Sequence, residues 1–181
     1  MKNALNKLCS TQRRKAGFLI FATLSLVITI IIFFLSSQTA KESSKLSGSV
    51  QEIPTEVIEN LLDEVKTEKK ESFITWFENW FRKIAHILLF FAYGFSLCGT
   101  FLNITAIKRF CLKPILAFLI GAVCSVLDEL HQLFVEGRSA EFLDIGFDLL
   151  GIVAGILIML VMYGMVLIFK RRKKSALKSS I

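Results

Sequence analysis

The chain has 181 residues, of which 54% are hydrophobic, and its mean hydropathy is +0.59. This composition excludes a disordered chain and is too apolar for an ordinary soluble domain, so it predicts an integral membrane protein. The formal net charge of +7 would favour a nucleic-acid partner if the basic residues lined a soluble face. They lie instead in short blocks beside apolar runs, which is typical of a topology signal, so no nucleic-acid partner is expected.

The first apolar run covers residues 17–35 and contains no charged residue. Its 19 residues would form a helix of about 28 Å, which is long enough to span a membrane. A cleaved signal peptide is the alternative, but its apolar region would be shorter, and residues 36–40 make a poor cleavage site. We therefore expect an uncleaved first span, preceded by a basic cytoplasmic segment at residues 1–16.

Residues 36–81 differ in composition, with eight acidic residues and five lysines between positions 41 and 71. From Pro54 onward, apolar residues recur along one stripe of an amphipathic helix. A second stripe of Phe and Trp at residues 73–81 suits the membrane–water interface. We expect an amphipathic segment that lies on the membrane or on the other helices, and a partner-binding helix is the alternative.

Three further spans are predicted at residues 83–102, 114–133 and 142–169, with short polar loops between them. The tail at residues 170–181 is basic, and we expect it to be cytoplasmic and unstructured. The predicted fold class is therefore an all-α integral membrane protein with four transmembrane helices. Residues 82–169 form its core.

The distribution of Lys and Arg predicts the orientation. The N-terminal segment, the loop at residues 103–113 and the tail together contain 14 of these residues, and the opposite side contains 8 in a longer, acidic stretch. The positive-inside rule then places both termini in the cytoplasm. Consequently, the start of the second span, the end of the third and the start of the fourth all reach the outer level of the membrane.

Ionisable side chains gather at that outer level, where they are costly and therefore indicate a functional site. On the third span, Asp128, His131 and Gln132 share one helix face, and Glu129 lies beside them. Arg138 at this level suits the bidentate binding of a carboxylate or phosphate. The predicted binding residues are Lys83, His86, Asp128, Glu129, Gln132, Arg138, Asp144 and Asp148.

The carboxylates and histidines of this group are also candidates for proton transfer, because such side chains serve as general acids and bases. The catalytic candidates are Asp128, Glu129, His86 and His131. A purely structural network of ion pairs is the alternative interpretation. A metal site built from the histidines and acidic residues is conceivable, but the chain has no HExxH motif and no paired Cys/His spacing. We therefore expect neither a metal nor a cofactor.

On the fourth span, Asp144 and Asp148 share a face with Gly151 and Gly155. Glycines four residues apart allow another helix to approach closely, so this face is predicted to pack against a neighbour. Asp148 lies one turn deeper than Asp144. Burial of its charge would cost less if it met Lys83, Arg138 or His86.

The order of these motifs resembles the VanZ-like family of small bacterial membrane proteins, over residues 34–155. The family pattern usually has a proline where this chain has Glu136, and often Asn or Asp at the position of Asp148. The matching elements are Phe34-Leu35-Ser36-Ser37-Gln38, Ser43-Ser44, Arg82-Lys83-Ile84-Ala85-His86, Asp128-Glu129-Leu130-His131-Gln132-Leu133-Phe134, Gly137-Arg138-Ser139, Asp144, Asp148 and Gly151-xxx-Gly155.

The resemblance implies a multi-pass protein of the bacterial cell membrane that lowers susceptibility to teicoplanin-like lipoglycopeptides, and it assigns no biochemical activity. The leading hypothesis is a non-catalytic site that binds or shields headgroups. Its expected partners are membrane lipids, with a cell-wall precursor or a lipoglycopeptide as the further candidates. One alternative is a hydrolase or transferase that acts on a lipid-linked phosphate, with Asp128 or Glu129 as the acid–base residue. Another is a structural or transporter-associated subunit, and the oligomeric state stays open.

Overall fold

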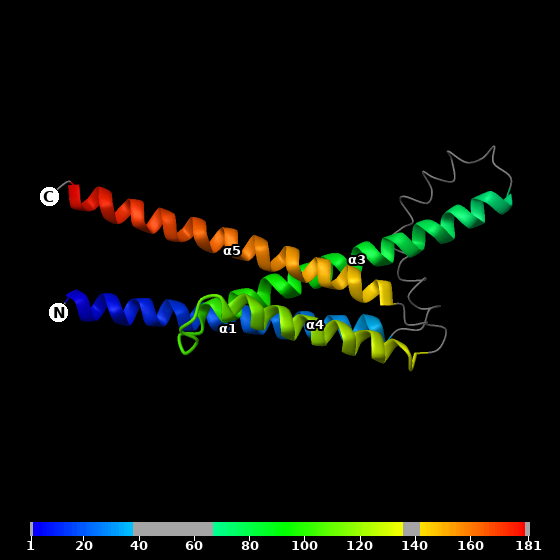
Figure 1. The fold of residues 1–181 in the computed structure, drawn as a ribbon, viewed down its shortest axis with the longest axis horizontal. Coiled ribbons are helices and arrows are strands. Elements are labelled where there is room, and N and C mark those ends of the chain that lie inside the picture. The colour runs from blue at the N-terminus through cyan, green and yellow to red at the C-terminus, as the bar shows by residue number, and fades with distance from the viewer. Residues whose placement is uncertain (1, 38–66, 136–141, 180–181) are drawn as a thin grey trace.

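In the computed structural model, the described parts of the chain are residues 2–37, 67–135 and 142–179, and their regular elements are all helices (Figure 1). These helices are α1 (Lys2–Ser36), α3 (Thr67–Asn103), α4 (Leu112–Gln132) and α5 (Phe142–Ser179). Each contains a stretch that is long and apolar enough to cross a membrane, at Thr11–Ser36, Lys83–Asn103, Leu112–Gln132 and Leu143–Lys173. The prediction of an all-α fold with four such helices is confirmed.

Two helices continue well past the apolar runs that predicted them. α1 already begins at Lys2, and α5 continues to Ser179, so the tail that we expected to be unstructured is helical up to that residue. Lys and Arg are good helix formers, so a basic segment can prolong a helix beyond the membrane. The hydropathy of the sequence indicates where each helix leaves the apolar medium. It does not indicate where the helix ends.

The segment between the first two spans is described only in part. The amphipathic stripe that begins at Pro54 lies outside the described residues. From Thr67 onward the chain is helical, and α3 continues without a break into the second span, so the stripe at residues 73–81 belongs to the same helix. In Figure 1, this first part of α3 extends beyond the other three helices.

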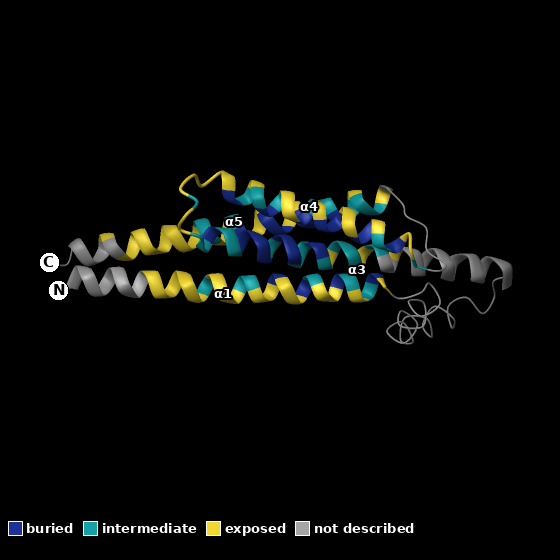
Figure 2. Cartoon of the chain, turned by 90° about the horizontal axis from the view of Figure 1, so that it is seen from below, coloured by how far each residue is buried: buried dark blue, intermediate teal, exposed yellow. Residues whose placement is uncertain are grey.

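α3 is the central helix, because α1, α4 and α5 all pack against it. The side chains of Phe90 on α3, Ile32 on α1 and Ile152 on α5 are almost completely buried between the helices. Figure 2 shows the buried residues along α3 and on the helix faces that turn toward it, with exposed residues on the outer faces. Those outer faces carry many large apolar side chains, as a helix bundle surrounded by lipid requires.

α3 and α5 approach each other closely through glycines on both helices. A Cβ atom added to Gly151 would lie 2.5 Å from the carbonyl oxygen of Ile87, and one added to Gly155 would collide with that of Phe91. In the opposite direction, Gly94 of α3 faces the backbone of Ile152. The close approach predicted from the glycine spacing is therefore confirmed, and it fixes these two helices against each other.

Both chain ends lie at the same end of the bundle, as Figures 1 and 2 agree. The loop between α3 and α4 points toward that end, and it is held by a buried lysine. Lys113 donates two hydrogen bonds from Nζ, to the carbonyl oxygens of Leu102 at 3.2 Å and Ile104 at 2.8 Å. A cation at a helix C-terminus satisfies carbonyl groups that lack a partner within the helix, so Lys113 ties the end of α3 to the start of α4.

Candidate functional site

Three ionisable side chains from three different helices meet near the end of the bundle opposite the termini. His86 comes from α3, Asp128 from α4 and Asp148 from α5, and each offers an atom within 4.8 Å of the others. Both carboxyl groups are in the interior, since each aspartate is only 1% exposed. The sequence predicted that these helix ends would converge, and the structure brings the side chains together.

Each buried aspartate is held by a neutral hydrogen-bond donor from one side. Gln132 donates from Nε2 to Oδ2 of Asp128 at 3.0 Å, and Ser125 donates from Oγ to Oδ2 of Asp148 at 2.9 Å. The second oxygen, Oδ1, of each aspartate has no hydrogen-bond partner within the described segments. Both carboxyl groups are therefore fixed in orientation, with one oxygen each left available.

His86 forms the third corner of the cluster. Its Nδ1 atom is 3.6 Å from Oδ1 of Asp148, and its ring stacks on Phe90 with a centroid distance of 6.3 Å. The histidine thereby lies within ion-pair distance of the deeper aspartate. Among the basic partners considered for Asp148, the structure places His86 of the second span beside it.

A second charged pair forms the rim above this cluster. Lys83 on α3 lies 3.1 Å from Asp144 on α5, and their side chains are 20% and 22% exposed. The ammonium group also lies over the ring of Phe147, 5.5 Å from its centroid, in a cation–π contact. Trp80 packs edge-to-face against the same ring at 6.4 Å. The rings of Phe147 and Trp80 form an aromatic shelf beside the Lys83–Asp144 pair.

A small cavity lies between the rim and the cluster. Its volume of about 10 Å³ is close to that of a single water site. Its walls combine one positive charge, one negative charge, an imidazole, an amide and an aromatic ring. The lining residues are Lys83, His86, Gln132, Asp144 and Phe147.

The family model for VanZ/LLP1 matches residues 21–167, which include the C-terminal part of α1, all of α4 and the whole cluster. The chain belongs to the VanZ/LLP1 family. The resemblance inferred from the motifs is thus confirmed over most of the chain. No curated protein and no solved structure matches the chain significantly.

Two residues predicted for this VanZ/LLP1 site lie apart from the three-residue cluster or outside the described chain. His131 packs edge-to-face on Phe33 of α1 at 6.0 Å, whereas His86 joins the aspartates. Arg138 lies outside the described residues. Glu129 is buried at the same end of α4, next in sequence to Asp128.

The sequence analysis missed Ser125 and Phe147 as members of the VanZ/LLP1 site. Ser125 lies three residues before Asp128 and seven before Gln132, so helical periodicity places all three on one face of α4. That spacing would have been the signal. Ser36 also reaches this region, because its Oγ donates to the backbone oxygen of Asp128 at 3.4 Å and so joins α1 to α4.

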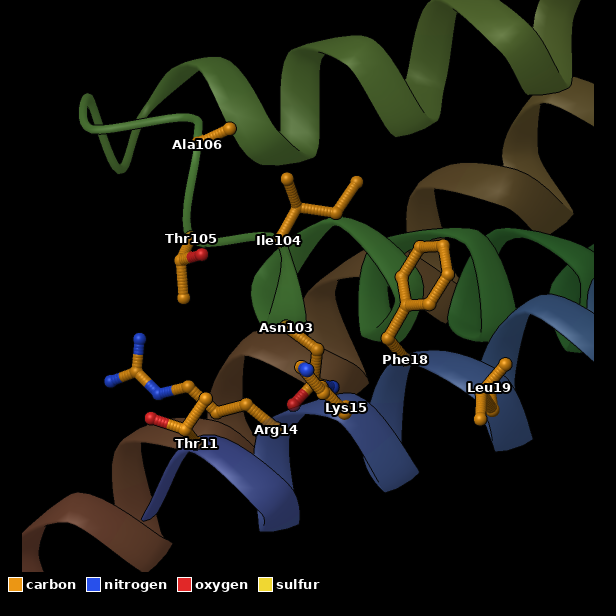
Figure 3. A pocket seen from close by; sticks show the side chains of 9 residues that line it. All are labelled: Thr11, Arg14, Lys15, Phe18, Leu19, Asn103, Ile104, Thr105 and Ala106. Atoms are coloured by element: carbon orange, nitrogen blue, oxygen red, sulfur yellow. The ribbon is translucent and has the colours of Figure 1, made fainter. Parts of the chain in front are cut away.

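A larger cleft of about 390 Å³ lies at the opposite end of this VanZ/LLP1 protein, between α1 and the region where α3 ends (Figure 3). Its walls are mainly apolar, with basic side chains of α1 at the edge. None of the residues predicted for the polar site lines it. The lining residues are Thr11, Arg14, Lys15, Phe18, Leu19, Asn103, Ile104, Thr105 and Ala106.

Proposed function

We propose that this VanZ/LLP1 protein is a multi-pass protein of the bacterial cell membrane that binds the phosphate-bearing headgroup of a lipid or a lipid-linked cell-wall precursor at the outer membrane face. The observation that carries the proposal is the rim pair of Lys83 and Asp144 on its shelf of Trp80 and Phe147. By covering such headgroups, the protein would lower susceptibility to teicoplanin-like lipoglycopeptides. The VanZ family resemblance supports this last step.

The rim has the features that a headgroup requires. Lys83 is partly exposed, and its ammonium group is a compact cation of the kind that binds phosphate. Trp80 is 45% exposed next to it, and tryptophan favours the headgroup level of a membrane. A phosphate would contact Lys83 in competition with Asp144, while the aromatic shelf would contact the glycerol or upper acyl region.

The cavity below the rim limits how a headgroup binds. Because it has room for about one water, a headgroup does not enter it and has to bind at the rim. The buried cluster then supports the rim from below. Binding at the rim also agrees with a shielding role, in which the protein covers the headgroup without transforming it.

The proposed orientation rests on the positive-inside rule, and it is testable by labelling. Single cysteines placed at Ser37 and at Thr105, both exposed, in a chain without its native cysteines should differ in access. We expect a membrane-impermeant thiol reagent applied to intact cells to label position 37 and to leave position 105 unlabelled. Labelling of position 105 alone would place the rim in the cytoplasm and overturn the proposal.

The functional test compares teicoplanin and vancomycin susceptibility in a Gram-positive host that expresses the protein. Wild type should shift the teicoplanin inhibitory concentration selectively, and Lys83→Gln or Asp144→Asn should remove the shift. Lys108→Gln is the matched control, because Lys108 is an exposed lysine at the other end of the bundle. Arg138→Ala and Asp128→Asn complete the series.

Membrane levels of each variant have to be equal for this comparison. If Lys83→Gln retains the full shift at equal expression, the rim does not bind the protective ligand. An equal shift for both antibiotics would contradict the role of the lipid tail. Direct binding is measured with purified protein and a fluorescent phosphatidic acid, which phosphatidylcholine should displace only poorly.

A membrane enzyme that acts on a lipid-linked phosphate is the second candidate. It is favoured by the contact between His86 and Asp148, since a histidine beside a carboxylate is a common arrangement in general acid–base catalysis. Asp128→Asn and Glu129→Gln separate the two functions. Both changes should abolish turnover if the cluster is catalytic, whereas a rim that only binds headgroups tolerates at least one of them.

A further inference from the structure

We propose that His86, Asp128 and Asp148 form a binding site for a divalent transition-metal ion. The inference is independent of headgroup binding, because it concerns the buried cluster and not the rim. The sequence predicted no metal, since it contains no pair of ligands at a recognised spacing. The structure assembles the three candidate ligands from three helices, which no local motif records.

The first observation is the set of unused oxygen atoms. Asp128 and Asp148 each accept a hydrogen bond at Oδ2, while Oδ1 of each has no hydrogen-bond partner among the described residues. Both residues are 1% exposed, so water does not serve these oxygens from bulk solvent. A buried ionised carboxylate with an unused oxygen is costly, and a bound cation offsets this cost.

The second observation is the spacing. The 3.6 Å between Nδ1 of His86 and Oδ1 of Asp148 is too long for a hydrogen bond. It matches two ligands of one ion, because bonds of about 2.0–2.2 Å place neighbouring ligand atoms roughly 3–4 Å apart. Asp128 also offers a ligand atom, and one such atom from each of the three residues lies within 4.8 Å of the others, so a small inward movement completes the site.

The donors on the far side of each carboxylate are the third observation. Ser125 and Gln132 hold the Oδ2 atoms and thereby orient the Oδ1 atoms. Metal-binding carboxylates are commonly fixed by such outer hydrogen bonds. Neither donor carries a charge, so neither offsets the negative charge of the two aspartates.

Charge balance favours a cation over a purely internal ion pair. A protonated His86 would offset one of the two aspartates, and Lys83 already pairs with Asp144. A divalent ion with neutral His86 would offset both aspartates.

The ligand set indicates the class of ion. One imidazole and two carboxylates suit Zn²⁺, Mn²⁺ or Fe²⁺, whereas Ca²⁺ and Mg²⁺ prefer oxygen ligands alone. Three protein ligands leave at least one coordination position for water. The cavity of about 10 Å³ beside His86 has room for it.

The test uses the full chain, purified in detergent, stripped with a chelator and dialysed against one ion at a time. We expect about one Zn²⁺, Mn²⁺ or Co²⁺ per chain by elemental mass spectrometry, and no retention of Mg²⁺ or Ca²⁺. Bound Co²⁺ should give a visible absorption spectrum typical of nitrogen and oxygen ligands. Asp128→Asn and Asp148→Asn keep the side-chain shape and remove the charged ligand, His86→Gln removes the imidazole ligand, and His131→Gln is the matched histidine control.

Loss of an outer partner alone weakens metal binding by roughly 10–100-fold. We therefore expect Ser125→Ala to weaken binding by about tenfold, and each ligand variant to weaken it by at least about 100-fold. His131→Gln should bind as wild type does. Monodisperse elution and the far-UV circular dichroism of each variant establish that the protein is folded.

Several outcomes would overturn the inference. They are failure of the stripped wild type to bind any of the transition metals, unchanged binding in all three ligand variants, or an equal loss in His131→Gln. If the ligand variants do not fold, the wild-type Co²⁺ spectrum decides, and a spectrum identical to that of free Co²⁺ refutes the site. Absence of metal from a protein that still shifts teicoplanin susceptibility would refute this inference alone and leave the proposed function intact.

Discussion

The two ends of the bundle handle charge in opposite ways. At the end with the termini, Arg14 and Lys15 are exposed beside a cleft of about 390 Å³. At the other end, Asp128 and Asp148 are buried beside His86, and the cavity is only about 10 Å³. The larger cavity is therefore far from the reactive side chains. Charges at the open end rely on solvent and headgroups, whereas those at the tight end rely on one another.

The largest difference should follow from removal of the imidazole that contacts the buried aspartates, that of His86. His86→Leu leaves two buried carboxylates without their histidine, and breaking such a buried pair costs about 3–5 kcal/mol. Thermal unfolding in detergent should show this loss. Arg14→Leu, at the open end, should change the stability by less than about 0.5 kcal/mol because the residue is exposed. Equal losses would mean that the two ends do not differ as described.

The next effect concerns the glycine contact between α3 and α5. Gly155→Ala places a methyl group against the carbonyl oxygen of Phe91, and overpacking of this kind costs about 1–3 kcal/mol. Gly164→Ala is the matched control on the same helix, because an added Cβ there meets no atom within 4 Å. The control should unfold at or above the wild-type temperature. A stable Gly155→Ala protein would show that the two helices can separate freely.

Among the residues whose burial is described, the open end contains one buried charge, at Lys113, which provides a direct comparison with the cluster. Lys113→Met removes hydrogen bonds to the carbonyl oxygens of Leu102 and Ile104 and should cost about 1–2 kcal/mol. Lys108→Met, in the same loop, should be neutral because Lys108 is exposed. The measurement is again thermal unfolding in detergent. An equal effect of both changes would remove Lys113 as the link between α3 and α4.

The smallest effect on stability is expected in the middle of the bundle, between its two ends. Ser25 of α1 donates to Ser96 of α3 at 3.0 Å, in the buried interior. Hydrogen bonds between membrane helices average about 0.6 kcal/mol, so Ser25→Ala should cost about that amount. Thr23→Ala on the exposed side of α1 controls for the loss of a hydroxyl group. A loss above that of Gly155→Ala would contradict the ranking of packing over polar contacts.

The number of spans was predictable from the sequence, because an apolar run of sufficient length is a direct consequence of bilayer thickness. The helix limits were not, since α5 continues through a basic segment to Ser179 that hydropathy treats as a tail. The continuity of α3 from Thr67 was also missed. A change from polar to apolar composition looks like a boundary even where the backbone hydrogen bonds continue.

The site was predictable as a level in the membrane but not as a set of contacts. On a helix with about 100° per residue, His131 and Gln132 lie on opposite sides of Asp128. Sequence does not say which side faces α3 and α5. Packing decides it: Gln132 binds Asp128, and His131 turns toward Phe33 of α1. The choice between the two histidines therefore required the helix arrangement.

The Lys113 link has a consequence for how α4 tolerates changes in length. The link fixes the start of α4, and Asp128 follows fifteen residues later, about 22 Å along the helix axis. The length of the helix therefore sets the depth and the direction of the Asp128 carboxylate. Inserting one residue between them would turn Asp128 by about 100° and raise it by about 1.5 Å, away from His86. Substitutions along the lipid face of α4 should be tolerated far better than any insertion or deletion.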